Sequence, residues 1–217
     1  MLRLLALIAF GLVILSQGGS AQETGGFTIT RGADTVAVEQ FSRQQVELTG
    51  TLVRRSGKTV VDRVRYQATL VDDQSAVLIE LSDWRGDDPD SGPARQTARV
   101  IFKDDSVAVD DHTRGTGLVT RVLPTTPTAI GYLNLSTAFL EQATRRAAHS
   151  PRDSLAVPFF NLGGGQTVTG TVRRLGPDSS VVRIGPVDYH VRVDPEGRIL
   201  GGAVPAQNLL ISRTSVH

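Results

Sequence analysis

The chain has no cysteine among its 217 residues, and it contains one tryptophan and one methionine. Disulfide bonds and thiolate metal sites are therefore excluded, and a lipid anchor attached through cysteine has no attachment point. Aromatic residues make up only 5% of the sequence, and the formal net charge is +1. A nearly neutral chain has no global electrostatic reason to bind nucleic acid or an anionic membrane, so we expect neither partner.

The one long apolar run lies at the N-terminus, where Leu4 to Leu15 follow the single basic residue Arg3. Small and polar residues come next, up to Ala21. This order predicts a signal peptide over residues 1–21, cleaved after Ala21. An uncleaved membrane anchor is the alternative, but the run falls short of the roughly 20 apolar residues that span a bilayer. We therefore expect an exported protein, periplasmic or extracellular, with no stable membrane span after cleavage.

The rest of the chain, residues 22–217, is predicted to form a single β-rich domain. Its clearest signal is Val187 to Val193, where apolar and polar residues alternate strictly before the turn Asp194 to Gly197. The segment from Val64 to Leu70 alternates in the same way. Such alternation is typical of strands with one buried face, and short turns without intervening helices indicate antiparallel pairing. The predicted fold is mainly β, a single curved antiparallel sheet or a partly closed β-barrel or roll with one packed α-helix.

The predicted helix lies between about residues 130 and 149, where turn residues become rare. Phe139, Leu140, Ala143 and Ala147 recur there at helical spacing and form a small apolar face. Ser136 or Thr137 can cap its start, and Ser150-Pro151 ends it. We expect this face to pack against the sheet.

Two segments, 46–81 and 167–205, share an approximate order of residues. Leu48-Thr49-Gly50-Thr51 corresponds to Val168-Thr169-Gly170-Thr171, and Tyr66 corresponds to Tyr189. One interpretation is an internal repeat whose copies form facing halves of the sheet. The alternative is that any antiparallel meander reuses Thr, Val and Gly at similar places, and both remain open.

No catalytic signature stands out. Asp188, His190 and Arg192 share one strand face and could perform acid–base chemistry, but we favour a solvent-exposed face with an ion pair, because a neutral sheet surface commonly carries mixed charges. There is no Gly-x-Ser-x-Gly nucleophile motif, and the acidic loop within 82–96 lacks the ligands that calcium requires. We therefore assign no catalytic residue, no metal ligand and no cofactor. The residues proposed for ligand binding are Tyr66, Trp84, Phe139, Tyr189 and His190, with core packing as the alternative for Trp84.

The strand Val187 to Val193, followed by Asp194-Pro195-Glu196-Gly197-Arg198-Ile199-Leu200, resembles a group of uncharacterised secreted bacterial β-rich proteins. The expected architecture is also loosely similar to the bowl-shaped periplasmic carriers of lipoproteins and lipids. In those carriers an incomplete barrel holds an acyl chain and helices plug the concavity. The resemblance implies binding and assigns no residue a role.

Three functions follow as hypotheses. The leading one is a non-enzymatic binding protein that holds a lipid or another hydrophobic or amphipathic molecule in a β-bowl. The alternative is an envelope interaction or structural module that recognises protein or polysaccharide through strand edges and loops. The least favoured is a hydrolase that uses His190 or His112.

Overall fold

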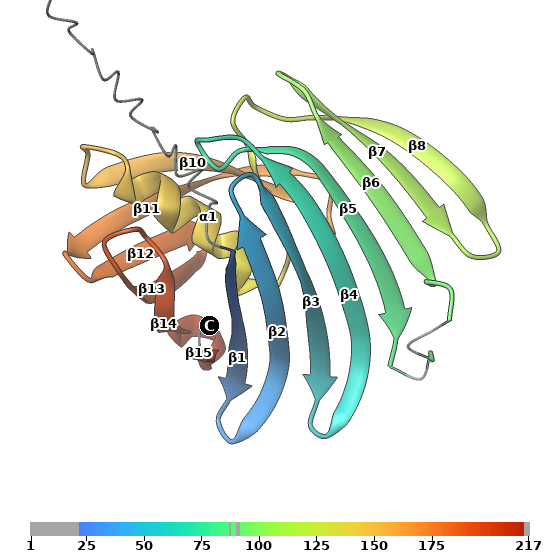
Figure 1. The fold of residues 1–217 in the computed structure, drawn as a ribbon, viewed down its shortest axis with the longest axis horizontal. Coiled ribbons are helices and arrows are strands. Elements are labelled where there is room, and N and C mark those ends of the chain that lie inside the picture. The colour runs from blue at the N-terminus through green and yellow to red at the C-terminus, as the bar shows by residue number, and fades with distance from the viewer. Residues whose placement is uncertain (1–21, 87, 90–91, 215–217) are drawn as a thin grey trace, which may run out of the picture.

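The computed structural model describes residues 22–86, 88–89 and 92–214. Its described part forms one fifteen-stranded sheet, an α-helix and one short 3₁₀ turn (Figure 1). The first eight strands are β1 (Glu23–Arg31), β2 (Asp34–Gln44), β3 (Glu47–Ser56), β4 (Thr59–Leu70), β5 (Ala76–Arg85), β6 (Gln96–Phe102), β7 (Ser106–Thr113) and β8 (Gly117–Pro124). After β9 (Ile130–Tyr132) and α1 (Thr137–Ala148) follow β10 (Ser154–Asn161), β11 (Thr167–Gly176), β12 (Ser179–Ile184), β13 (Val187–Val193), β14 (Ile199–Val204), the 3₁₀ turn Pro205–Gln207 and β15 (Leu209–Thr214).

The strands lie in the order β8-β7-β6-β5-β4-β3-β2-β1-β15-β14-β13-β12-β11-β10-β9. Strands that pair in the sheet are consecutive in the chain, except where β1 pairs with β15, with Gly26 opposite Thr214, and the consecutive strands β8 and β9 lie at the two ends of the sheet. Every pairing is antiparallel apart from β9 with β10. The predicted fold class is therefore confirmed: the protein is mainly β, with a single curved sheet that is not closed into a barrel.

The sheet curls so far that its β9 end lies against the inner face of β5, the face turned toward the helix. The amide of Ala76 donates to the carbonyl of Ala129 at 3.2 Å. A Cβ added at Gly131 would lie only 2.4 Å from Cδ1 of Ile79 and 3.1 Å from Cε1 of Phe139, so a larger residue would have to displace these side chains where β9 approaches β5. The two ends of the sheet thus overlap face to face.

Strand alternation decides which side chains point inward. Along β4, Val64, Tyr66, Ala68 and Leu70 are buried while the residues between them are exposed or half-buried. In β13, Val191 and Val193 are buried, and Val187 and Tyr189 pack against the same core. The predicted inward apolar row of Val187 to Val193 is therefore confirmed.

Helix α1 starts and ends where its caps predict. Ser136 is the N-cap and its hydroxyl accepts a hydrogen bond from the amide of Phe139 at 3.2 Å. The helix lies inside the hollow between the β1–β8 arm and the β10–β15 arm (Figure 1). The sequence predicted one small buried face, but more of the helix surface is buried, because the wrapped sheet also encloses Glu141, Gln142 and Thr144. A helix enclosed in this way must satisfy polar groups internally.

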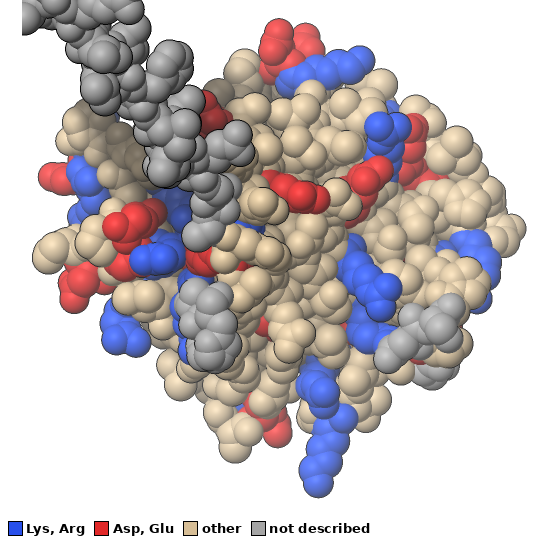
Figure 2. All heavy atoms as spheres, viewed as in Figure 1, with Lys and Arg blue, Asp and Glu red and all other residues tan. Residues whose placement is uncertain are grey.

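Within the described residues, no helix is long and apolar enough to cross a membrane. The predicted signal peptide, residues 1–21, lies outside the described residues. Basic and acidic side chains are interspersed over the face that Figure 2 shows. The two segments of the predicted repeat fall on opposite arms, 46–81 in β3 to β5 and 167–205 in β11 to β14, and their common origin stays a prediction.

Candidate functional site

A groove of about 290 Å³ lies between the inner face of β3 to β8 and the loop after β10. Its apolar lining comes from the sheet on one side and from β9, β10 and their loops on the other. The apolar lining residues are Val64, Leu81, Ala98, Val100, Val109, Leu123, Leu133, Phe160 and Leu162. A larger hollow of about 690 Å³ on the outer face is lined mainly by Thr, Ser and charged side chains, and its only aliphatic lining residues are Leu81, Ala98 and Leu118. The inner groove is therefore the better candidate for a small-molecule site.

Along β5 and β6, the side chains that point into the groove change from apolar at one end of the strand to polar at the other. The change has the same direction on both strands. On β6 it runs from Val100 through Ala98 to Gln96, and on β5 it runs from Leu81 to Asp83. The registers Leu81 with Ala98 and Asp83 with Gln96 bring these changes into line. We call the polar lining residues Arg54, Asp83, Arg95, Gln96, Asp111 and Arg121 the polar rim. The groove is thus amphipathic, apolar at one end and polar at the other.

The charges of the polar rim are compensated by its own two aspartates and by the neighbouring Asp62. Arg54 binds Asp62 at 2.6 Å, and Arg95 forms a hydrogen-bonded ion pair with Asp83. The hydrogen bond to Asp83 raises the pKa of Arg95.

Asp111 completes this pattern. Its carboxylate accepts hydrogen bonds from Nε2 of Gln96 at 2.8 and 3.0 Å and pairs with Arg121 at 3.5 Å. Each of the three arginines therefore has one aspartate. A rim without surplus charge suits a neutral or zwitterionic polar group better than a bare anion, which would have to displace an aspartate.

The wall facing the sheet is a glycine-rich loop, Gly163 to Gly165. The side-chain oxygen of Asn161 accepts hydrogen bonds from the amides of Gly163 at 3.0 Å and Gly164 at 3.2 Å. Gly165 has φ +68°, and a Cβ there would lie 2.8 Å from Cδ1 of Leu123. Glycine suits this position because the left-handed backbone strains other residues and a Cβ would have to displace the Leu123 side chain.

Helix α1 is anchored at its N-terminus by Glu39, a fully buried residue of β2. The two carboxyl oxygens accept hydrogen bonds from the amides of Thr137 at 2.8 Å and Ala138 at 3.0 Å, from the hydroxyl of Tyr66 at 2.9 Å, and from the hydroxyl of Ser136. Burial raises the pKa of Glu39, and these hydrogen bonds partly offset that rise. A negative charge here also faces the positive end of the helix dipole.

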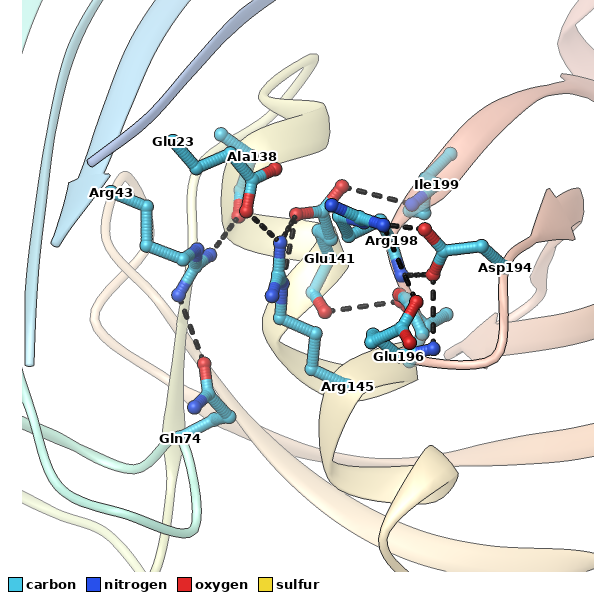
Figure 3. Close-up of polar contacts among 12 residues, drawn as sticks. Glu23, Arg43, Gln74, Ala138, Glu141, Arg145, Asp194, Glu196, Arg198 and Ile199 are labelled. Carbon is cyan, nitrogen blue, oxygen red and sulfur yellow. Dashed lines mark hydrogen bonds and ion pairs between the residues drawn. The ribbon is translucent and has the colours of Figure 1, made fainter. Parts of the chain in front are cut away.

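A second buried cluster holds the middle of the helix (Figure 3). Glu141, fully buried, accepts from Arg145 at 2.8 Å, from Arg213 at 2.6 Å and from the amide of Ile199 at 2.8 Å. Glu23 bridges the same two arginines at 2.6 and 2.7 Å. Burial lowers the pKa of Arg145, but the two glutamates outweigh it and the net shift is upward. The cluster ties α1 to β1 and β15, the strands that join the arms.

The turn after β13 packs on the same helix. Gly197, with φ +78°, comes so close that a Cβ would lie 2.5 Å from the carbonyl oxygen of Thr144. The hydroxyl of Thr144 donates to the carbonyl of Gly197 at 2.6 Å. Asp194 holds the turn by accepting from the amide of Arg198 at 2.8 Å (Figure 3). The segment 194–200 that marks the resemblance thus docks the helix.

Among the side chains with a buried polar atom that lacks a partner within the described residues, Arg43 and Gln142 lie at helix α1. Arg43 donates to Gln74 at 2.9 Å and to the carbonyl of Ala138, while its Nε has no partner within the described residues. Burial lowers the pKa of Arg43 to about 10. Gln142 is fully buried on α1, and within the described part of the chain neither its amide nitrogen nor its oxygen has a partner. Unlike the polar rim, neither residue lines the groove.

The five residues proposed from sequence for ligand binding do not gather at the groove, and none of them lines it. Tyr66 and Phe139 meet in the core, edge to face, with ring centroids 4.9 Å apart. Tyr189 shares a 2.9 Å hydroxyl contact with Tyr132 beside a cavity of only about 20 Å³.

The other two proposed residues lie on the outer face. Trp84 is buried there: its indole nitrogen donates to the carbonyl of Gly92 at 3.0 Å, and the Arg65 guanidinium lies 5.0 Å from the ring centre. His190 is exposed on the same side of the sheet as Asp188. Asp188 binds Arg183 through two hydrogen bonds of 2.6 and 2.8 Å, which lower the pKa of Asp188. This arrangement favours the interpretation of Asp188 and His190 as a solvated strand face.

The groove residues were missed because no single motif marks them. Alternation assigns Val64 to an inward face from sequence alone, and the same applies to Val100. The lateral register that aligns six strands, and the loop that covers them, are properties of the folded chain.

No protein-family model and no curated protein sequence matches the chain. The fold is shared with solved structures, among them the two that follow. One is a DUF1089 family protein from Pseudomonas aeruginosa, with a TM-score of 0.55 and 10% identity over 79% of this chain and 91% of that one. The other is described as a beta-barrel-like protein of domain of unknown function DUF1849 from Brucella abortus, with a TM-score of 0.55 and 12% identity over 90% of this chain and 96% of that one. The chain is thus similar in fold to β-rich bacterial proteins of unknown function.

Proposed function

We propose that this chain is an exported, non-enzymatic binding protein that holds one small amphipathic molecule in the groove. The observation that carries the proposal is the shared change from apolar to polar along the inward rows of the groove strands. The apolar end would take an acyl chain or a similar tail. The polar rim would take the head group, in the manner of ligand sites with a few placed polar groups in an apolar pocket.

The chemistry of the rim narrows the class of ligand. Because Arg54, Arg95 and Arg121 are each paired with an aspartate, the rim offers both donors and acceptors without surplus charge. We therefore propose that monoacylglycerols or zwitterionic lysophospholipids bind more tightly than fatty acids of the same chain length. The volume of about 290 Å³ favours short or medium chains over long ones.

The experiment uses residues 22–217 and displacement of a fluorescent apolar dye. Ligands would be medium-chain fatty acids, monoacylglycerols and lysophosphatidylcholines. Replacing Ala98 by Trp fills the groove and should abolish saturable binding. Replacing the adjacent Thr97 by Trp places the same ring on the outer face and should leave binding intact. Absence of saturable binding for all three classes, or equal loss in both variants, would refute the proposal.

Export is part of the same proposal and has its own test. The mature protein recovered after secretion should begin at Gln22, as N-terminal sequencing or intact mass would measure. A chain that retains residues 1–21 in the envelope would favour the anchored alternative.

An envelope interaction module is the second candidate function. The observation that favours it is the exposed apolar edge strand β8, with Leu118 64% and Val122 70% exposed. A module of this kind would keep its binding partner when Ala98 is replaced by Trp, whereas a groove-binding protein would lose its ligand.

A further inference from the structure

The two edges of the sheet differ in how they are protected. At one end, β9 is covered by β5 and α1, and its first two residues are buried. At the other end, β8 pairs only with β7, and all its residues except Leu123 are exposed. Leu118, Val119 and Val122 are 64%, 52% and 70% exposed, so apolar side chains occupy both faces of this edge. Such an edge is a template for another strand.

The hydrogen bond from the amide of Thr125 to the carbonyl of Asp105, at 2.9 Å, sets which backbone groups point outward. It continues the β7–β8 register, in which Ser106 lies opposite Pro124. In an antiparallel pair, residues alternate between directing both backbone groups toward the partner and directing both away. The amides and carbonyls of Leu118, Thr120 and Val122 therefore point to the free edge. The backbone of Pro124 also points to the free edge. Its missing N–H therefore removes no hydrogen bond between β8 and β7.

We propose that β8 pairs antiparallel with β8 of a second copy of this chain, about a twofold axis at Thr120. In this register the two Thr120 residues lie opposite each other, and Leu118 of each copy lies opposite Val122 of the other. All three pairs exchange both of their hydrogen bonds, because these residues carry the outward backbone groups.

The side chains of β8 are complementary to themselves in this register. On the outer face, Leu118 meets Val122 and Thr120 meets Thr120, and apolar and Thr–Thr cross-strand pairs stabilise sheets. On the inner face, Arg121 lies opposite Val119 rather than opposite another cation. Arg121 is also within 3.5 Å of Asp111 of its own chain, which compensates its charge. These matches favour a second copy over an unrelated strand.

The dimer would also join the two grooves, since Arg121 and Leu123 of β8 line each of them. Val119 of the second copy would then stand beside the polar rim at Arg121. The pairing itself does not depend on the proposed ligand, and the experiment measures association without one.

Because the chain has no cysteine, disulfide trapping tests the register directly. In a hydrogen-bonded pair the Cα atoms lie about 5.5 Å apart, within the range for a disulfide. Oxidised residues 22–217 carrying Thr120→Cys should therefore form a covalent dimer. Val122→Cys alone should not, because the two copies of position 122 would be separated by roughly four residues, or about 14 Å. Leu118→Cys together with Val122→Cys should restore the crosslink.

Sedimentation velocity gives the second measurement, on the protein without cysteines. We expect a reversible dimer that Val122→Lys and Thr120→Pro each weaken at least tenfold. The control Leu210→Lys changes an exposed apolar residue in the middle of the sheet and should leave the dimer unchanged. Melting temperatures would verify that each variant is folded. A wild-type monomer at about 100 μM, well above the micromolar range of weak specific association, would overturn the proposal. So would equal crosslinking at positions 120 and 122.

Discussion

Glu39 offers the sharpest test of how the helix is held inside the sheet. Its carboxyl group accepts four hydrogen bonds in a site without solvent. Glu39→Leu leaves the amides of Thr137 and Ala138 and two hydroxyls without their acceptor. An unsatisfied buried donor costs about 1–3 kcal/mol, and breaking a buried charged network costs about 3–5 kcal/mol. Because the hydroxyls can turn to other acceptors, we expect Glu39→Leu to lower the free energy of unfolding by about 4 kcal/mol.

Glu39→Gln separates the charge from the hydrogen bonds. The side-chain oxygen of the glutamine can still accept hydrogen bonds from the two helix amides. Its NH₂ group faces the hydroxyls of Ser136 and Tyr66, which can rotate to accept hydrogen bonds. The expected loss is about 1–2 kcal/mol. Urea denaturation followed by far-UV circular dichroism and by fluorescence of the single tryptophan would measure both values. The exposed Glu47 of β3 provides the control, and its replacement by Leu should stay within about 0.5 kcal/mol.

The pH dependence gives the second readout of the same site. Because burial raises the pKa of Glu39, the folded state binds this proton more tightly than the unfolded state. Its contribution to stability is therefore fully present below the ordinary value of 4.5 and is lost as pH rises through the folded-state pKa. Glu39→Gln should remove this slope. A stability difference between wild type and Glu39→Gln that is constant with pH would refute the reasoning, as would a cost under about 1 kcal/mol for Glu39→Leu.

Two further substitutions test packing. Gln142→Leu removes a buried side-chain amide that has no partner within the described residues. It should therefore raise the free energy of unfolding, measured by urea denaturation, by about 1–2 kcal/mol. A lower free energy of unfolding would show that the amide does have a hydrogen-bond partner. Gly131→Ala places a methyl group 2.4 Å from Cδ1 of Ile79 and should lower the melting temperature, at a cost of about 1–3 kcal/mol. In the control Gly163→Ala the nearest atom is 3.6 Å away, so a comparable loss there would contradict the steric explanation.

Local periodicity was enough to predict the strands and the helix, because each depends on a few adjacent residues. The Ser136 cap and the inward row of Val187 to Val193 are examples. Periodicity could not reveal that Glu141 and Gln142 are buried. On an isolated amphipathic helix polar residues mark the solvent side, and only the wrapped sheet encloses that side here.

The candidate site was less predictable from the sequence because two properties determine it together. One is which side chains of each strand face inward, and the other is how neighbouring strands are aligned. Asp83 faces the groove while the next residue, Trp84, faces outward, so the conspicuous aromatic side chain pointed away from the relevant surface. Tyr66 and Phe139 were attractive as ligand contacts, but the helix that carries Phe139 fills the part of the hollow that Tyr66 faces. Pairing between β1 and β15, at opposite ends of the chain, carries no local signal at all.

Because β1 pairs with β15, the strand order of the sheet is that of a circularly permuted meander. The strand order reads consecutively from β9 to β15 and then from β1 to β8, with Thr214 beside Gly26 where the two runs meet. In a variant of residues 22–214 with a short loop from Thr214 to Gln22 and new ends cut between β8 and β9, every strand would lie next to its chain neighbour in the sheet. Such a permutant would have a lower contact order and should fold faster. In the order found here, by contrast, β1 must wait until β15 has been synthesised before the two arms can join.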